Sequence, residues 1–261
     1  MSRIKQSFCY PLYLDEGTTL AELFKHASGI GYAAVELWWR KECPFDEICE
    51  QARSNALVVA SMCGHGTLEN GLNKRENHSR IEEELGESIQ IARERGIPGL
   101  ICFSGNRNPG QSDEEGLEIC AEGLARVKGM AETAGVNLNV ELLNSKVNHP
   151  GYQCDRTAWG VRLMEAVASR NVKLLYDIYH MQIMEGDVIR AIRENIRHIG
   201  HFHTAGNPGR NDLDDSQELN YVGICRAIAE TDYAYYVGHE FVPKGNKLIA
   251  LETAFRICDQ G

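Results

Sequence analysis

The chain has 261 residues, of which 43% are hydrophobic, and a formal net charge of −10 at pH 7. This length and composition favour one large domain, so we expect a single domain over residues 1–261. The negative charge argues against a protein that holds nucleic acid or an anionic membrane by nonspecific attraction. No apolar run of about 18 or more residues is present, which argues against a membrane span.

Cysteine usage and the start of the chain predict a cytoplasmic location. The nine cysteines form no C-x-x-C pair, and several, such as Cys9, Cys63 and Cys102, lie in or at the end of apolar runs. This pattern is typical of reduced, buried thiols. The segment Met1–Gln6 is polar and no long apolar stretch follows it, so we expect no signal peptide.

Eight short stretches predict β-strands. The first four are expected at Gln6–Tyr10, Ala33–Leu37, Leu57–Met62 and Gly99–Phe103. The other four are expected at Val136–Leu142, Val172–Asp177, Ile196–His203 and Tyr235–Glu240. Several are almost continuously apolar, which is typical of parallel strands covered by helices.

Helices are predicted between these strands. Capping boxes are expected at three pairs, Thr19 with Glu22, Ser79 with Glu82, and Ser112 with Glu115, and the glycines expected to end these helices are Gly29, Gly96 and Gly135. Asp155 is expected to cap a helix over Ala158–Ser169, and later helices are expected over Gly186–Arg193, Tyr221–Glu230 and Asn246–Cys258. Strict alternation of eight strands with helices predicts an α/β fold, a closed (β/α)8 TIM barrel.

The longest polar connections are 106–113, 144–152 and 206–217, and each follows a predicted strand. In a parallel barrel the loops that follow strands form the catalytic face. No glycine-rich phosphate-binding motif follows the first strand, which argues against a nucleotide or dinucleotide site.

Four predicted strands end with side chains of the kind that bind metals, namely Glu141, Asp177, His203 and Glu240. They recur about once per strand–helix unit, so a parallel barrel would bring them to the same rim. Carboxylates with one imidazole suit a divalent cation such as Mg²⁺ or Mn²⁺. Zn²⁺ is less favoured, because it more usually recruits several His or Cys ligands.

Each of these residues also has a structural interpretation when taken alone. Glu141 could pair with a Lys or Arg, Asp177 could cap the next helix, and His201 with His203 is a pair more often structural than ligating. Four such side chains at matched strand ends favour the metal site. Around it, His180, Arg210 and His65 are expected to contact substrate, although Arg210 could also be a solvated loop charge.

Seven segments of the chain carry a resemblance to a known family, namely 141–144, 149–152, 176–182, 199–203, 208–210, 218–221 and 238–243. They resemble the hydroxypyruvate isomerase family of xylose-isomerase-like barrels. The resemblance implies a metal at Glu141, Asp177, position 203 and Glu240, with substrate bound by His180 and Arg210.

The sequence departs from that family at one expected ligand. Hydroxypyruvate isomerases typically have Gln where this chain has His203. His203 followed by Thr204 is similar to the ketose 3-epimerases of the same superfamily, yet those proteins carry a substrate-contacting Glu where this chain has Val147. The chain therefore mixes features of both groups.

Together these features predict a metal-dependent isomerase. We expect it to act through an enediolate on hydroxypyruvate or a related short 2-oxo or hydroxy acid, with Glu141 and Glu240 as the acid/base pair. The partner is a small-molecule substrate, and no organic cofactor is expected because the reaction is redox-neutral. The main competing prediction is a ketose 3-epimerase of the tagatose or psicose type acting on a neutral sugar.

Two less favoured functions stay open. The first is cleavage of damaged DNA by a barrel that holds three metal ions, and the second is a catalytically silent sensor or scaffold. The sequence also leaves open whether the chain forms a homo-oligomer.

Overall fold

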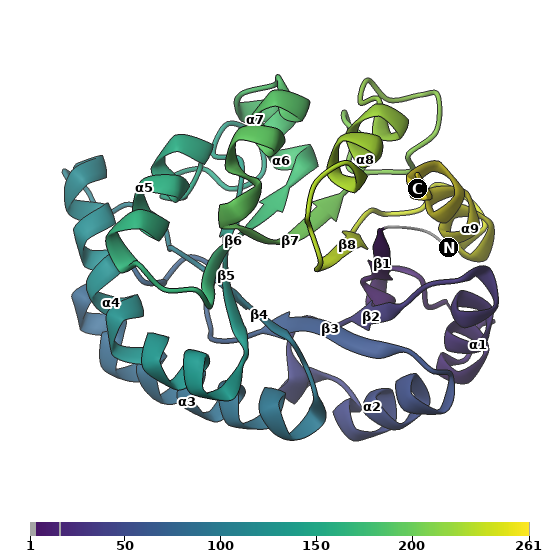
Figure 1. Ribbon diagram of the computed structural model, residues 1–261, viewed down its shortest axis with the longest axis horizontal. Coiled ribbons are helices and arrows are strands. Elements are labelled where there is room, and N and C mark those ends of the chain that lie inside the picture. The colour runs from purple at the N-terminus through teal and green to yellow at the C-terminus, as the bar shows by residue number, and fades with distance from the viewer. Residues whose placement is uncertain (1–3, 16, 261) are drawn as a thin grey trace. The chain divides into compact units, whose positions relative to one another are not determined.

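The computed structural model describes residues 4–15 and 17–260. Residues 1–3, 16 and 261 lie outside the described residues. The first three belong to the segment on which the signal-peptide prediction rests, and all five belong to the predicted domain. Within the described residues, strands and helices alternate along the chain (Figure 1). The α/β class predicted from the sequence is therefore confirmed.

All eight predicted strands are present; β6 has the predicted bounds, and the ends of the other seven differ by one to a few residues. They are β1 Lys5–Phe8, β2 Ala34–Glu36, β3 Val58–Cys63, β4 Gly99–Cys102, β5 Asn137–Leu142, β6 Val172–Asp177, β7 Ile199–Thr204 and β8 Tyr236–His239. The expected start of β7 at Ile196 is wrong, because residues 196–198 form a short 3-10 helix. Glu240 directly follows β8 instead of closing it.

The strands form one sheet in the order β1-β8-β7-β6-β5-β4-β3-β2. The pairings are parallel, for example Phe8 opposite His239 and Leu138 opposite Val172. An isolated parallel bridge between Cys9 and Glu36 continues from β1 to β2, the two ends of that order. This topology confirms the predicted (β/α)8 barrel.

The α-helices are α1 Leu20–Ile30, α2 Phe45–Ser54, α3 His78–Arg95, α4 Asp113–Ala134, α5 Thr157–Val167, α6 Ile178–Met184, α7 Val188–Asn195, α8 Tyr221–Ala229 and α9 Lys247–Cys258. The capping and spacing signals in the sequence do not identify α2 or α6. The predicted capping box at Thr19 and Glu22 is confirmed, and so is the cap of α4 by Ser112.

Three predicted helix ends are wrong. Gly29 lies inside α1, and Gly31 ends the helix in the left-handed conformation with φ of 119°. Ser79 is not a cap, because α3 already begins at His78. Asp155 does not cap α5, because its carboxylate forms an ion pair with Arg107 at 3.2 Å.

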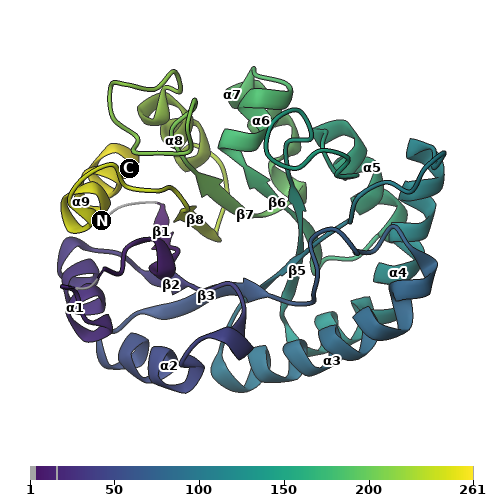
Figure 2. The same cartoon turned by 180° about the vertical axis from the view of Figure 1, so that it is seen from behind.

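The chain divides into two compact units. Of the described residues, the first comprises 4–15, 17–62, 187–197 and 202–260. Its core includes an aromatic cluster in which the ring of Phe8 lies 5.8 Å from that of Tyr13 and 5.2 Å from that of Tyr32. Helices α1 and α9 lie side by side next to β1 (Figure 2).

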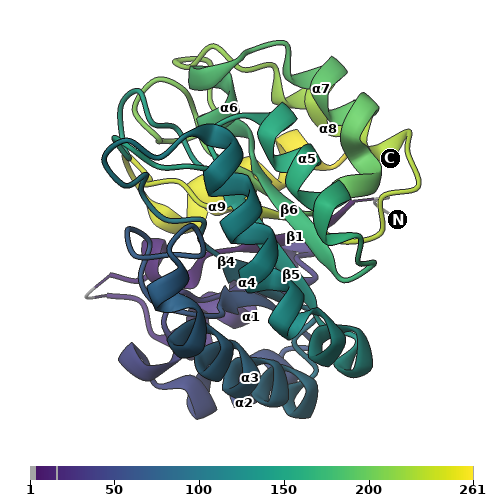
Figure 3. The same cartoon turned by 90° about the vertical axis from the view of Figure 1, so that its left-hand side faces the viewer.

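The second unit comprises residues 63–186 and 198–201. Helices α3, α4 and α5 follow one another along β4, β5 and β6 (Figure 3). A Cβ on Gly160 of α5 would lie 2.9 Å from the side chain of Leu174 in β6, so this helix needs glycine to approach the sheet closely. The expectation that residues 1–261 form a single domain stays a prediction.

All nine cysteines are free thiols, and seven of them are buried. In the part of the chain that the structure describes, no helix combines the length and hydropathy needed to cross a lipid bilayer.

Candidate active site

The predicted ligand residues lie at the carboxyl ends of four strands that are consecutive in the chain. Glu141 is the penultimate residue of β5, Asp177 ends β6, His203 is the penultimate residue of β7, and Glu240 follows β8. All four side chains are buried. The positions agree with the catalytic end of a parallel barrel.

In the second unit, Glu141 and Asp177 form a pair of buried carboxylates. In the β5–β6 register Glu141 lies opposite Leu175, so Asp177, two residues further on, shares its face of the sheet. One carboxylate oxygen of Glu141 and one of Asp177 lie within 4.8 Å of each other. Two buried carboxylates at this separation repel each other unless a proton or a cation lies between them, so the pair suits a cation.

Asp177 also caps a helix, which is the structural role that its place in the sequence suggests. Its Oδ1 atom accepts the backbone N–H of His180 at 2.9 Å, at the first turn of α6. The cap uses only one of the two carboxylate oxygens. The cap and the pairing with Glu141 are therefore compatible.

The imidazole of His180 is held by Asn144, in the loop after β5. The Nδ2 atom of Asn144 lies 2.5 Å from Nδ1 of His180. Because an amide nitrogen only donates, Nδ1 accepts and the ring proton lies on Nε2. That Nε2 atom lies 3.7 Å from Oδ2 of Asp177.

Asn144 is in turn fixed by its own loop. Its Oδ1 atom accepts the backbone N–H groups of Val147 at 3.0 Å and Asn148 at 2.8 Å. The ring of His149 lies 5.3 Å from that of His180. Residues 144–149 therefore build the support of His180, a role that a polar loop in the sequence does not reveal.

His65, the third predicted substrate residue, lies two residues after the end of β3 and is buried. Its Nε2 atom accepts the backbone N–H of Phe103 at 3.0 Å, and its Nδ1 atom lies 3.3 Å from the carbonyl oxygen of Gly66. Burial lowers the pKa of His65 from 6.5 to about 4. The ring is thus neutral, and both nitrogens face the backbone.

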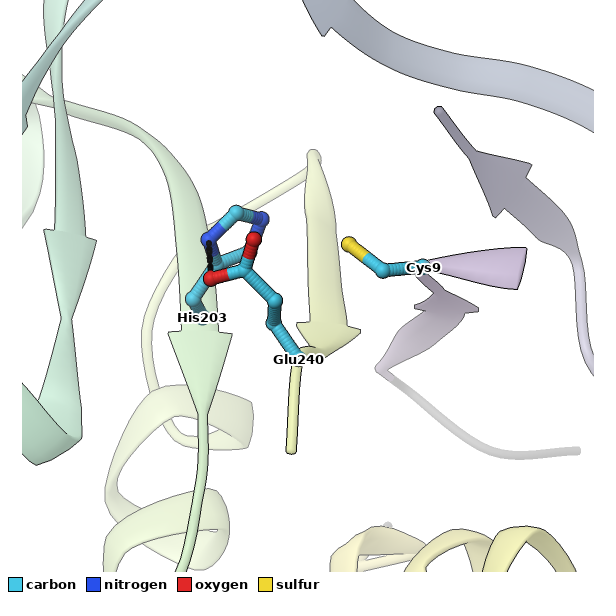
Figure 4. A group of neighbouring side chains, drawn as sticks. All are labelled: Cys9, His203 and Glu240. Carbon is cyan, nitrogen blue, oxygen red and sulfur yellow. Dashed lines mark ion pairs between the residues drawn. The ribbon is translucent and has the colours of Figure 1, made fainter. Parts of the chain in front are cut away.

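In the first unit, Glu240 is surrounded by donors. Its Oε2 atom lies 3.2 Å from Nδ1 of His203 and also pairs with the guanidinium of Arg210, while the indole N–H of Trp38 donates to Oε1 at 2.7 Å. Burial alone would raise the pKa of Glu240, but the charges of His203 and Arg210 hold it well below the usual value. Glu240 is therefore ionised. Figure 4 shows Glu240 and His203 joined by their ion pair.

Arg210 lies in the loop between β7 and α8, with its backbone in the left-handed region at φ of 56°. Its carbonyl oxygen accepts the N–H of Val242 at 2.9 Å, and its side chain reaches the carboxylate of Glu240. Arg210 is thus not a solvated loop charge. It is the counter-ion of the buried acid.

The sequence reasoning missed Glu36, which ends β2 and orients His203. The Nε2 atom of His203 lies 3.0 Å from Oε2 of Glu36, and the hydroxyl of Ser7 donates to Oε1 of Glu36 at 2.5 Å. Because a carboxylate only accepts, the ring proton is on Nε2. Nδ1 faces Glu240 at 3.2 Å, so without a cation a second ring proton lies between them, and a bound cation would take the place of that proton.

The signal for Glu36 was present in the sequence, since it is another acid at a strand end. Trp38, two residues further on, gave no comparable signal.

The chain matches the family model of the xylose isomerase-like TIM barrel over residues 24–255. It is 28% identical over 230 residues to hydroxypyruvate isomerase of Escherichia coli strain K12, covering 85% of this chain and 87% of that protein. It is 30% identical to the putative hydroxypyruvate isomerase of Danio rerio, covering 87% and 85%. It is 25% identical to 2-oxo-tetronate isomerase of Pectobacterium atrosepticum, covering 85% and 86%.

Solved structures with the same fold include other enzymes. An AP endonuclease, family 2, from Brucella melitensis superposes with a TM-score of 0.80 at 23% identity, covering 96% of this chain and 97% of that chain. D-psicose 3-epimerase from Clostridium cellulolyticum H10 superposes with a TM-score of 0.77 at 18% identity, covering 98% and 97%. At these identities the likeness is one of fold.

Proposed function

The chain belongs to the xylose isomerase-like TIM barrel family, and from this membership we propose that it is a divalent-metal-dependent isomerase of hydroxypyruvate or a related short 2-oxo or hydroxy acid. Its similarity to isomerases over most of their length supports an isomerase. The choice of substrate rests on the names of these relatives, which are isomerases of hydroxypyruvate and 2-oxo-tetronate. The observation that carries the chemistry is the ionised, buried Glu240 beside His203 and Arg210.

We assign the metal to Glu141, Asp177, His203 and Glu240. The support is chemical: each unit contributes two buried ligand-type side chains at strand ends, and each pair brings together atoms that repel without a proton or a cation. Three carboxylates with one imidazole suit Mg²⁺ or Mn²⁺. When bound, the cation supplies positive charge that stabilises negative charge developing on the substrate oxygens.

Glu141 and Glu240 are the proposed acid and base. An ionised carboxylate can remove a proton from the hydroxyl-bearing carbon next to the carbonyl, and the same or the other carboxyl group returns it to the former carbonyl carbon. The hydroxyl proton passes to the former carbonyl oxygen, so the carbonyl and hydroxyl groups exchange places. Glu240 is already ionised by its partners, so it can accept a proton without first losing one. Trp38 and Arg210 fix the orientation of its carboxylate.

His180 and Arg210 are the proposed substrate contacts. The neutral ring of His180, with its proton on Nε2, can donate a hydrogen bond to a substrate oxygen. The guanidinium of Arg210 can exchange part of its pairing with Glu240 for a substrate carboxylate, because both are planar anions that suit its fork of donors. His65 stays a candidate contact, with its ring nitrogens directed at the backbone.

A ketose 3-epimerase is the second candidate. His203 and the fold shared with D-psicose 3-epimerase favour it. Against it, Val147 stands where the epimerases carry a substrate-contacting Glu, and its apolar side chain is 63% exposed. This position offers no carboxylate to a sugar, so the isomerase is preferred.

Exchange of the carbon-bound proton for deuterium separates the two functions. Purified protein with Mn²⁺ is incubated in heavy water with hydroxypyruvate or with a panel of ketoses, and exchange is followed by NMR. We expect exchange and isomerisation of hydroxypyruvate, loss of both after chelation, and recovery on adding Mn²⁺. Preferential exchange at carbon 3 of a ketose would make the protein an epimerase.

The acid/base assignment is tested by Glu141→Gln and Glu240→Gln in the same assay. Each should abolish turnover, because an amide neither accepts nor returns the proton. Circular dichroism and thermal unfolding check that each variant is folded. Near-normal turnover in either folded variant would refute the two-acid mechanism.

A further inference from the structure

Cys9 brings a thiol to the two ligand residues of the first unit. The residue follows β1 and is completely buried. Its sulfur and one ligand atom each of His203 and Glu240 all lie within 4.8 Å of one another. Figure 4 shows the side chain of Cys9 directed toward the other two.

The register of β1, β8 and β7 explains why these three side chains lie close together. Phe8 in β1 lies opposite His239 in β8, and the N–H of Cys9 donates to the carbonyl oxygen of His239 at 3.1 Å. Cys9 and Glu240 are the next residues on the two strands, so they are neighbours at the same level. His203 pairs with Gly238 on the other side of β8, and Glu240 is two residues after Gly238. The group is thus set by backbone pairing.

The other two ligands are held in place by neighbours of their own. Glu36 fixes the ring of His203 through Nε2, and Trp38 fixes the carboxylate of Glu240 through Oε1. Contacts of this kind keep a metal ligand in position before the ion binds. Cys9 therefore adds sulfur to two preorganised donors.

Thiolate, imidazole and carboxylate form a donor set that differs from the oxygen-rich set proposed for catalysis. Three protein ligands of these types, with a further position for water or another group, are typical of zinc. A thiolate favours zinc over Mg²⁺ and Mn²⁺, which prefer oxygen. Cys9 also lies outside residues 24–255, so the family model does not cover it.

We propose that Cys9, His203 and Glu240 form a thiolate-containing zinc site. As zinc binds, the Cys9 thiol releases its proton to solvent and a zinc–sulfur bond forms. Because this site uses two of the proposed catalytic ligands, zinc competes with Mg²⁺ or Mn²⁺ and inhibits the isomerase. The inhibition rests on the proposed function, whereas zinc binding does not.

Cobalt reports the thiolate ligand directly. Metal-free protein is titrated with Co²⁺, which takes zinc sites and gives a thiolate-to-cobalt charge-transfer band in the near ultraviolet, and Zn²⁺ is then added to displace it. The wild-type protein should show the band, and Cys9→Ser should lose it. Cys49→Ser, at a half-buried cysteine of α2 outside this group, is the matched control and should keep it.

The affinities for Zn²⁺ and Mn²⁺ give a second measurement. Cys9→Ser should weaken Zn²⁺ binding by more than about tenfold, in the range seen for lost support of a metal site, and should leave Mn²⁺ binding close to wild type. Cys9→Ala serves the same purpose if the serine variant does not fold. A wild-type protein without the band, a band that survives Cys9→Ser, or equal loss of both affinities would overturn the proposal.

The test of the zinc site by cobalt binding does not depend on whether the protein turns over hydroxypyruvate. Failure of hydroxypyruvate exchange would remove the proposed isomerase while the cobalt band still decides the zinc site. With an active isomerase, added Zn²⁺ should inhibit the wild-type protein more strongly than the folded Cys9 variant.

Discussion

The Nε2 atom of His203 lies 3.0 Å from a carboxylate oxygen of Glu36, and both side chains are buried. Glu36 comes from β2 and His203 from β7, so the contact joins residues that are 167 positions apart in the chain. The carboxylate places one ring proton on Nε2 and leaves Nδ1 directed at Glu240, where the proposed cation would bind. Pairs of this kind tune metal sites by raising the basicity of the histidine.

Replacing Glu36 by Gln should therefore weaken Mn²⁺ binding. The amide keeps the shape of the side chain but removes the charge that raises the basicity of the ring, and we expect a loss of about 10–100-fold in affinity. Titration of the metal-free wild-type and variant proteins with Mn²⁺ measures this loss of affinity. Glu50→Gln, the same change on an exposed position of α2, should bind as wild type. Unchanged affinity in folded Glu36→Gln would show that Glu36 has no role in the metal site.

Gly238 makes room for the same pair. A Cβ at this position would lie 2.1 Å from Oε1 of Glu36 and 3.1 Å from the ring of His203. Gly238→Ala should therefore displace these side chains and lower the free energy of unfolding by about 1–3 kcal/mol, as overpacking of a core does. Urea denaturation measures the loss.

Gly245→Ala is the matched control for this substitution. Its Cβ would meet no atom within 4 Å, and the residue is exposed. We expect a change within about 0.5 kcal/mol. Equal stability of the two alanine variants would contradict the close packing at Gly238.

The strands could be predicted because their signal is local. Apolar runs such as Val172–Asp177 are read directly from the sequence, and that strand has the predicted bounds. Helix ends were less predictable, since Gly29 and Gly31 are both near the end of α1 and only the backbone conformation distinguishes them. Ser79 has the residues of a cap, but α3 begins one residue before it.

The candidate site divides in the same way. Glu141 and Glu240 could be named from their places at strand ends. The partner of Glu240, Trp38, lies 202 residues away in the chain and has no sequence pattern that links the two. Cys9 was interpreted only as one of several buried thiols, because its nearness to His203 depends on the register of β1, β8 and β7. Contacts between distant strands are properties of the fold.

His65 should make the folded protein less stable at acidic pH. Its pKa is lowered from 6.5 to about 4 by burial, so between these values the unfolded chain binds a proton that the folded chain does not. The stability that neutral His65 contributes is fully present above pH 6.5 and is lost as the pH falls toward 4. This shift in the pKa of His65 corresponds to about 3 kcal/mol in the free energy of unfolding. Protonation of Nε2 would also break the hydrogen bond from Phe103.

His65→Asn isolates this contribution from that of other groups. Burial also lowers the pKa of His239, to about 3, so His239 likewise reduces stability at acidic pH. It is present in both the wild-type protein and the His65 variant, so its contribution cancels in the comparison. The free energy of unfolding, measured by urea denaturation at several pH values, should fall less steeply between pH 6.5 and 4 in the variant. The variant should be less stable at neutral pH, because the Phe103 N–H loses its imidazole acceptor. Parallel pH profiles for the two proteins would mean that His65 does not stay neutral in the folded state.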